Sequence, residues 1–160
     1  MAEGSLAGVR IFISYAHEDE ALKKELDKFL KVLKRSSKIQ VWNDRELIAG
    51  QEWDAAIMAE LAAADVILLL VSVDFNASDF IWDKELASAM QRHEAGSARV
   101  VPIILRRCQW SSMPYAKLQA LPRNGAPVMD YDNRDDAFTE VAVELEKLVD
   151  QLLARPRPTA

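Results

Sequence analysis

Short apolar runs alternate with longer amphipathic segments along this chain. Four runs rich in Val, Ile, Leu and Phe have the length and composition of β-strands, and they cover residues 9–14, 39–42, 65–72 and 99–105. Residues 127–131 are a weaker candidate for a last strand, at the edge of the sheet. The run at 65–72 is almost continuously apolar, which is typical of a parallel strand that is covered on both faces.

Four other segments have helical periodicity, and they cover residues 18–34, 53–63, 78–93 and 135–153. The first segment carries an apolar stripe at spacings of three and four residues, which is formed by Leu22, Leu26, Phe29, Leu30 and Leu33. Ser78 or Asp79 is the expected N-cap of the third helix, because both side chains can accept a hydrogen bond from a free backbone N–H.

Strands that alternate with helices predict a three-layer, flavodoxin-like α/β fold, with a five-stranded parallel sheet and helices on both of its faces. Pro102 weakens a central placement of the strand at 99–105, because proline cannot donate to a ladder. We expect one domain over residues 9–153, a flexible N-terminus at 1–8, and a disordered tail or linker stub at 154–160. In open sheets of this kind, ligands bind beyond the carboxyl ends of the strands.

The composition excludes several classes of protein. The chain has 160 residues and a formal net charge of −5, which argues against broad nucleic-acid binding because phosphate neutralisation needs a basic surface. Cys108 is the single cysteine and the two histidines lie far apart, so neither a disulfide nor a zinc site is expected. The N-terminus does not resemble a secretory signal, and every apolar run is far shorter than the ~20 residues of a membrane span. We therefore expect a cytoplasmic protein.

Several common active sites are absent from the sequence. The five glycines never cluster into a phosphate-binding loop, and no serine lies on a glycine elbow. A phosphoacceptor receiver domain would share this architecture, but the third apolar run ends in Val71 and Ser72 instead of an aspartate. The one local basic pair, Arg106 and Arg107, is expected to be solvated, and Cys108 is expected to be an inert thiol.

Glu85 is the strongest remaining candidate for chemistry. It follows the third apolar run and lies near the N-terminal end of the helix at 78–93, where a ligand would enter. On a helix it flanks an apolar stripe that includes Trp82 and Leu86. The alternative interpretation is a solvated carboxylate on the border of an amphipathic helix, which is a common arrangement. In that case Trp82 would only pack, and Trp42, Trp53 and Trp110 are expected to pack as well.

Five groups of residues carry a resemblance to a known family, and they extend over most of residues 9–153. They are 12–16 (FISYA); 41–44 (VWND) with Leu47, Gly50 and Trp53; Val71 and Ser72 with Phe75 and Ser78; 82–86 (WDKEL); and 101–104 (VPII) with Trp110. In this order and spacing they resemble a Toll/interleukin receptor (TIR) domain, and most of all the stand-alone bacterial kind. Each group alone is weakly specific, but the combination is specific.

The resemblance implies one of two functional classes. TIR domains act as adaptor-like modules that signal through self-assembly, or as enzymes that cleave NAD+ at the nicotinamide–ribose bond. In the enzymes, a glutamate at the position that Glu85 matches is catalytic, and the loop that residues 43–52 match gates the site and mediates assembly. The resemblance implies substrate contacts from Tyr15, Ala16, His17, Asp44, Leu47, Ser72 and Trp82.

On this basis we expect an NAD+ glycohydrolase that produces nicotinamide and either ADP-ribose or a cyclic isomer. NAD+ is then the substrate, and neither a cofactor nor a metal is expected. By the same resemblance, the enzyme would act in bacterial defence signalling and be activated by homotypic assembly. A fused or separate sensor domain would be a further partner. Binding to nucleic acid or to a membrane is not expected. The alternative is a non-catalytic interaction module in which Glu85 is incidental.

Two features depart from the catalytic pattern. Many catalytic members have an aromatic residue four positions before the glutamate, whereas Ile81 occupies that position here and Trp82 follows it. Residues 17–20 (HEDE) are mostly acidic, which disfavours a diphosphate. A helix N-terminus could still hold the phosphates, with Arg45 or Lys84 as a source of positive charge.

Overall fold

The structure, a computed structural model, describes residues 8–42 and 52–154. A four-stranded parallel sheet lies at its centre, with the strand order β2-β1-β3-β4. The strands are β1 (Val9–Ser14), β2 (Ile39–Val41), β3 (Val66–Val71) and β4 (Arg99–Ile104). The expectations for residues 1–7, 43–51 and 155–160 lie outside the described part of the chain.

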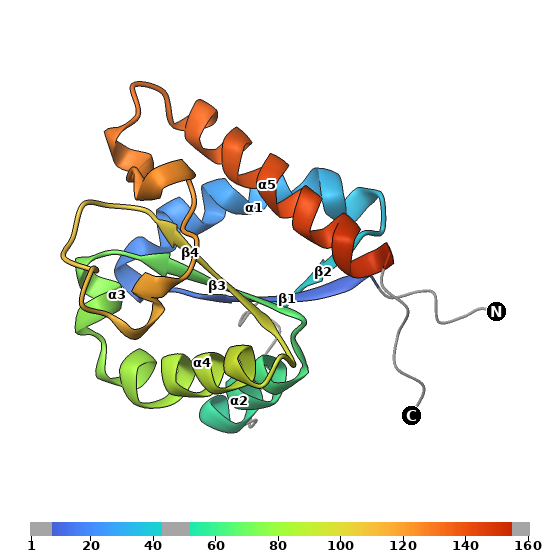
Figure 1. The fold of residues 1–160 in the computed structure, drawn as a ribbon, viewed down its shortest axis with the longest axis vertical. Helices are drawn as coiled ribbons and strands as arrows, with labels where there is room; N and C mark the ends of the chain where they lie inside the picture. Colours follow the sequence, from blue (N-terminus) through green and yellow to red (C-terminus); the bar gives the residue numbers. More distant parts are fainter. Residues whose placement is uncertain (1–7, 43–51, 155–160) are drawn as a thin grey trace.

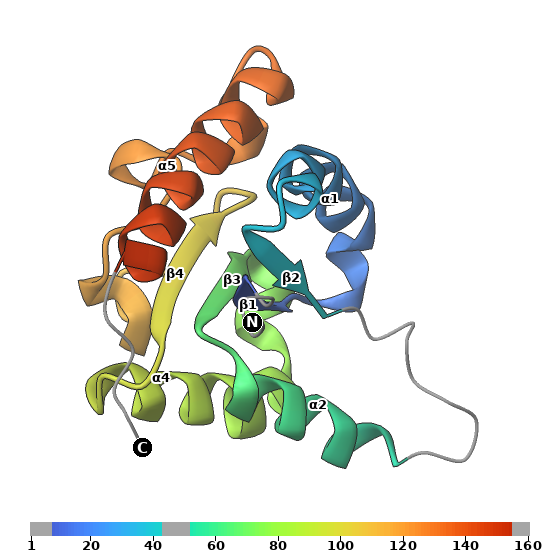
Figure 2. The same ribbon diagram turned by 90° about the vertical axis from the view of Figure 1, so that its right-hand side faces the viewer.

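Helices cover both faces of the sheet. They are α1 (Glu20–Arg35), α2 (Trp53–Ala63), α3 (Val73–Ala77), α4 (Ala87–Glu94) and α5 (Arg134–Ala154), with shorter turns η2 (His17–Asp19), η4 (Ile81–Leu86), η5 (Pro114–Lys117), η6 (Arg123–Gly125) and η7 (Val128–Asp130). Figure 1 shows the sheet nearly edge-on, with α1 and α5 on one side and α2 and α4 on the other. In Figure 2, α1 lies beside β2 and α2 lies beside α4. The predicted helices and the four stronger strands are confirmed, with small shifts at their ends.

The two apolar layers follow from the alternation of side chains along each strand. On β3, Leu68 and Leu70 belong to the cluster with α1 and α5, whereas Leu69 and Val71 belong to the cluster with α2, α3 and α4. Every residue of β3 is at most 1% exposed. Burial on both faces explains why this strand shows no apolar–polar alternation, and the prediction of a covered strand is confirmed.

The prediction of a fifth strand is wrong. Instead of a strand, the segment at 127–131 contains the 3-10 turn η7, and Met129 N donates to Leu105 O over 3.0 Å. Within the described residues, the outer edge of β4 carries one isolated bridge, between Ile103 and Leu121. Arg123 N, the next donor that a ladder would need, donates instead to Glu140 Oε2 over 2.6 Å, and the chain turns into η6 at that residue. The bridge therefore does not extend into a ladder.

Pro102 occupies a position in β4 where its missing N–H breaks no hydrogen bond to the neighbouring strand. Its carbonyl accepts from Leu121 N over 2.8 Å, so the backbone of Pro102 points to the outer edge of the sheet and not to β3. The missing N–H therefore costs no bond between β3 and β4, and the expected non-central placement of this strand is confirmed.

Candidate active site at the carboxyl edge of the sheet

A cleft of about 540 Å³ opens at the carboxyl end of β1. Ligands enter sheets of this kind at that edge, and small-molecule sites commonly have volumes of roughly 300–1,000 Å³. The wall of the cleft combines the end of β1 with residues of η2, α1, α2, α3 and η4. The cleft therefore reaches across the sheet edge, from the layer of α1 to the layer of α2 and η4.

Glu85 lies in the wall of this cleft. It is 7% exposed, and Ser14 Oγ donates a hydrogen bond to Glu85 Oε1 over 2.5 Å. Ser14 is the last residue of β1 and is itself 1% exposed. A carboxylate removed from water needs hydrogen bonds of this kind. The interpretation of Glu85 as a solvated helix carboxylate is therefore wrong.

A local change in helix geometry accompanies the inward position of Glu85. The helix begins after Ser78, whose Oγ accepts from Ile81 N over 3.3 Å, so Ser78 is confirmed as the N-cap. The turn η4 that follows is π-helical, a conformation that is rare and frequent at functional sites. It places Ile81 and Glu85 inside, at 4% and 7% exposed, and leaves Trp82 48% exposed. Trp82 is not among the residues that line the cleft, so its position gives no support to the predicted substrate contact.

The aromatic walls of the cleft come from other residues. Trp53, at the start of α2, packs against Phe80 with ring centroids 4.8 Å apart. Trp42 stacks on Phe12 at 5.9 Å, with an angle of 7° between the ring planes. All four side chains line the cleft. We expected the two tryptophans only to pack, but their position also lets them contact a planar ring or a sugar.

Three of the predicted substrate contacts do line the cleft: Tyr15, Ala16 and His17. They follow β1 directly, so the strand itself positions them at the sheet edge. The His17 side chain is 92% exposed, whereas Ala16 is buried. Their contact with a substrate stays a prediction. Asp44 and Leu47, together with all of the proposed gating loop 43–52 except Glu52, lie outside the described residues.

Ser72 is not among the residues that line the cleft. It is fully buried and caps α3, with its Oγ accepting from Phe75 N over 3.1 Å. Its hydroxyl donates to Asp19. The hydroxyl is thus engaged in structural hydrogen bonds, and its position gives no support to the predicted substrate contact of Ser72.

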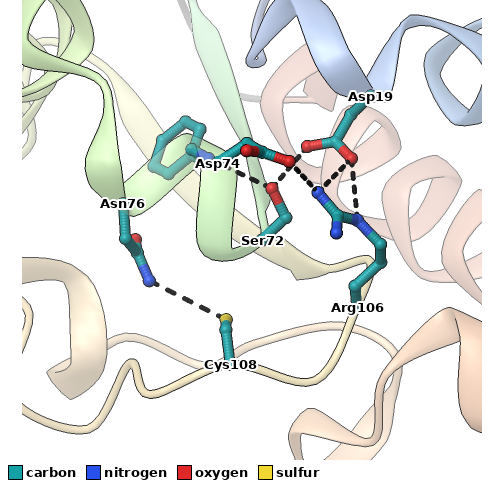
Figure 3. A network of polar contacts seen from close by, with 7 residues as sticks. Asp19, Ser72, Asp74, Asn76, Arg106 and Cys108 are labelled. Atoms are coloured by element: carbon teal, nitrogen blue, oxygen red, sulfur yellow. Dashed lines mark hydrogen bonds and ion pairs between the residues drawn. The ribbon is translucent and has the colours of Figure 1, made fainter.

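Arg106 is partly buried and ion-paired, contrary to the expectation of a solvated side chain. Figure 3 shows its guanidinium group between Asp19 of η2 and Asp74 of α3. Arg106 Nε donates to Asp19 Oδ1 over 2.9 Å, and Arg106 Nη2 donates to Asp74 Oδ2 over 2.6 Å. Burial disfavours the charged guanidinium, but the hydrogen bond to Asp74 and the charge of Asp19 outweigh burial and raise the pKa of Arg106. The segments that follow β1, β3 and β4 are thereby joined at the sheet edge, next to the cleft that Asp74 also lines.

Cys108 lies near this network, with Asn76 Nδ2 3.8 Å from its Sγ (Figure 3). Burial raises the pKa of the Cys108 thiol. A protonated thiol is a weak nucleophile, which agrees with the expectation of an inert group. Asn76 also accepts a hydrogen bond of 2.5 Å from the Tyr115 hydroxyl, whose pKa is raised by burial.

The structure adds Lys23 of α1 to the site, a residue that we did not predict. Lys23 is 4% exposed and lines the cleft. Its Nζ lies 2.9 Å from Asp27 Oδ2 and 5.6 Å from the centroid of the Tyr15 ring. The sequence contains a signal that could have identified it, because Lys23 precedes Leu26 and Leu30 at helical spacing and thus lies on the apolar stripe.

Two further observations concern the described residues only. No group of three or more His, Cys, Asp or Glu side chains in 8–42 and 52–154 could hold a metal ion. Over the same ranges, every helix is too short or too polar to cross a membrane.

The comparisons with known proteins agree with this architecture. The family model described as "TIR domain" matches residues 11–143. A protein of Sinorhizobium fredii (strain NBRC 101917 / NGR234), named "Uncharacterized protein y4lF", is 47% identical over 132 residues, which cover 82% of this chain and 41% of that protein. The crystal structure of a prokaryotic SEFIR domain is similar in fold, with a TM-score of 0.53 and 16% identity, over 96% of this chain and 100% of that chain.

The chain belongs to the TIR domain family. This family includes enzymes that cleave NAD+ and domains that interact with one another. The chain spans less than half of the length of its Sinorhizobium relative, and the likeness to the SEFIR domain concerns the fold alone.

Proposed function

We propose that the protein is an NAD+ glycohydrolase in which Glu85 is the catalytic residue. One observation carries the proposal: the Glu85 carboxylate is 7% exposed, accepts a hydrogen bond from Ser14, and lines a cleft of about 540 Å³ at the carboxyl edge of the sheet. Removing a carboxylate from water is costly, so a protein that gains only packing from this position would favour an apolar residue.

The chemistry of NAD+ cleavage requires one carboxylate. Most glycosidases need a second carboxyl group, which protonates the departing oxygen. In NAD+ the leaving nitrogen already belongs to a cationic pyridinium. When the bond between C1′ and this nitrogen breaks, its electron pair neutralises the pyridinium, and nicotinamide leaves without a proton. Water then adds to C1′ and releases a proton, which gives ADP-ribose; attack by a group of the same molecule gives a cyclic isomer.

Glu85 would act on the positive charge that develops at C1′ and the ring oxygen of the ribose. A fixed carboxylate in a site sheltered from water stabilises such a charge more strongly than a solvated one. The hydrogen bond from Ser14 holds Oε1 in place, so little reorganisation is needed when the charge appears. Trp53 and Phe80 form an aromatic wall of the same cleft, where the nicotinamide ring or the sugar can pack.

Activation by homotypic assembly and a role in defence signalling are part of the same proposal. They are supported by membership of the TIR family, and both functional classes of that family use contacts between copies. Activity is therefore measured over a range of protein concentrations, up to the highest that remains soluble.

The test incubates the purified chain with NAD+ and measures the released nicotinamide by chromatography. We expect release to rise more than proportionally with protein concentration, and Glu85→Gln to reduce it to the background rate. Asp83→Asn is the matched control, because it removes a carboxylate from the same helical turn at an exposed position. This control is expected to retain activity. Circular dichroism melts of both variants show whether the fold is intact.

Two results would reject the proposal. Turnover by a folded Glu85→Gln variant at the wild-type rate would remove Glu85 from the chemistry. No nicotinamide release by the wild-type chain at any concentration, although sedimentation shows that it assembles, would instead assign the protein to the non-catalytic interaction modules.

A further inference from the structure

Lys23 is a buried cation with unused hydrogen-bonding capacity. The residue is 4% exposed, although lysine is almost never buried without charged or polar partners. An ammonium group carries three N–H donors, and among the described residues Asp27 is the one acceptor within hydrogen-bond distance of Nζ, at 2.9 Å. Asp27 is itself 29% exposed. The ammonium can therefore make further hydrogen bonds to a ligand in the cleft that Lys23 lines.

Lys23 and Glu85 reach the cleft from opposite faces of the sheet. Lys23 belongs to α1, which packs in the layer with α5, whereas Glu85 belongs to η4, in the layer with α2. Tyr15, at the end of β1, packs under the Lys23 ammonium at 5.6 Å. Because both side chains line the same cleft, a ligand that extends from Glu85 across the end of β1 can contact both.

Lys23 supplies the positive charge of the cleft that an anionic ligand could bind. Among the described residues that line it, Lys23 is the single lysine or arginine, whereas Glu18, Asp74 and Glu85 are acidic. Asp74 is paired with Arg106. Glu18 is exposed, so water and salt screen its charge. The buried charge of Lys23 is screened less and acts more strongly on a ligand in the cleft.

We propose that Lys23 binds the diphosphate of the substrate and so makes the site selective for dinucleotides over the corresponding riboside. This inference rests on the proposed function for the identity of the substrate. Lys23 would also supply the positive charge that a diphosphate needs beside the mostly acidic residues 17–20. Lys84, one of the two candidate cations, is exposed and is not among the residues that line the cleft.

The experiment compares two substrates that share the same scissile bond: NAD+, and nicotinamide riboside, which has no phosphate. Lys23→Met keeps the apolar stem and removes the charge. Lys24→Met is the matched control, because Lys24 is the next residue of the same helix, is 54% exposed and pairs with Glu20 over 3.3 Å. Melting curves verify that both variants are folded. Steady-state rates give kcat and KM for each substrate.

We expect Lys23→Met to raise KM for NAD+ by about tenfold or more, the lower end of what a hydrogen bond to a charged group is worth. The kcat of Lys23→Met for NAD+ should stay within about twofold of the wild-type value, and the variant should cleave the riboside at the wild-type rate. Lys24→Met should match wild type with both substrates. A parallel loss on NAD+ and the riboside, or a fall in kcat at unchanged KM, overturns the proposal and makes Lys23 structural.

Calorimetric titration with ADP separates this proposal from the proposed function. ADP carries the diphosphate but has no nicotinamide bond to cleave. If the wild-type chain cleaves neither substrate, ADP binding that Lys23→Met weakens about tenfold and Lys24→Met leaves unchanged still supports the diphosphate site. Equal ADP binding by wild type and Lys23→Met, or no binding to wild type at millimolar ADP, refutes it.

Discussion

Replacing Arg106 by methionine tests its ion pairs with Asp19 and Asp74 without any assumption about function. The change removes the cation from Asp19, which is 2% exposed, and from Asp74. Breaking a fully buried ion pair costs about 3–5 kcal/mol, whereas exposed pairs contribute about 0–1 kcal/mol. The Arg106 side chain is 34% exposed, and Asp19 keeps the hydrogen bond from Ser72. We therefore expect a loss of about 2–3 kcal/mol in the free energy of unfolding.

Equilibrium unfolding in urea, monitored by circular dichroism, measures this loss. A destabilisation of this size lowers the melting temperature of a domain of this length by roughly 4–12 °C. Arg107→Met is the matched control, because Arg107 is the next residue, its side chain is 83% exposed, and it pairs only with Asp130 among the described residues. We expect Arg107→Met to unfold close to the wild-type midpoint.

A double-mutant cycle with Asp19→Asn assigns the loss to the pair. Without the buried charge of Asp19, the loss of Arg106 should cost less, with a coupling of at least about 1 kcal/mol between the two sites. If Arg106→Met unfolds within about 0.5 kcal/mol of wild type, or if the two losses simply add, Arg106 does not stabilise Asp19 and the argument from burial fails.

Two other predictions concern the sheet edge and the pH dependence of stability. Ser14→Ala should lower kcat for NAD+ about tenfold at nearly unchanged KM, because it removes the hydrogen bond that holds Glu85 Oε1. Ser14→Thr keeps a hydroxyl group and should restore most of the rate. An equal loss of kcat in both variants would show that packing, and not the hydroxyl, matters. His93 accepts a hydrogen bond from Val100 N at Nδ1 over 3.1 Å, and burial, together with the charges of Arg99 and Lys117, lowers the pKa of His93. The stability that depends on neutral His93 is thus complete above the unfolded pKa of about 6.5 and is lost as the pH falls from there towards the lower folded value. Melts at several pH values should show a smaller loss in His93→Asn than in wild type, and identical pH profiles would contradict this role.

The patterns along the chain were sufficient for the elements and the class of fold. The apolar run of β3 and the stripe of α1 depend on residues that are close in sequence. The continuous run is buried on both faces of the sheet, and the burial of α1 follows the helical period of about 3.6 residues. The number of strands was not available in this way. Residues 127–131 have the composition of a short strand, but whether they pair depends on the edge of β4, where Leu121, which belongs to another segment, takes the backbone hydrogen bonds of Pro102 and Ile104.

The site shows the same division. The place of Glu85 beyond the third strand followed from the order of elements, and its proposed role followed from the family resemblance. Its burial did not, because a π-helical turn and a hydrogen bond to Ser14, 71 residues earlier in the sequence, bring it inside. Trp82 is a residue type that can stack on a sugar or a ring, yet the same turn leaves it 48% exposed.

Sequence alone thus determined the layers, the strand ends that carry the cleft, and the family. Tertiary structure decided which charged side chains are buried: Glu85 beside Ser14, Lys23 over Tyr15, and Arg106 with Asp19, across 87 residues. The physical reason is that a local pattern reports on apolar periodicity, whereas a buried charge is stabilised by partners that only the folded chain brings within hydrogen-bond distance.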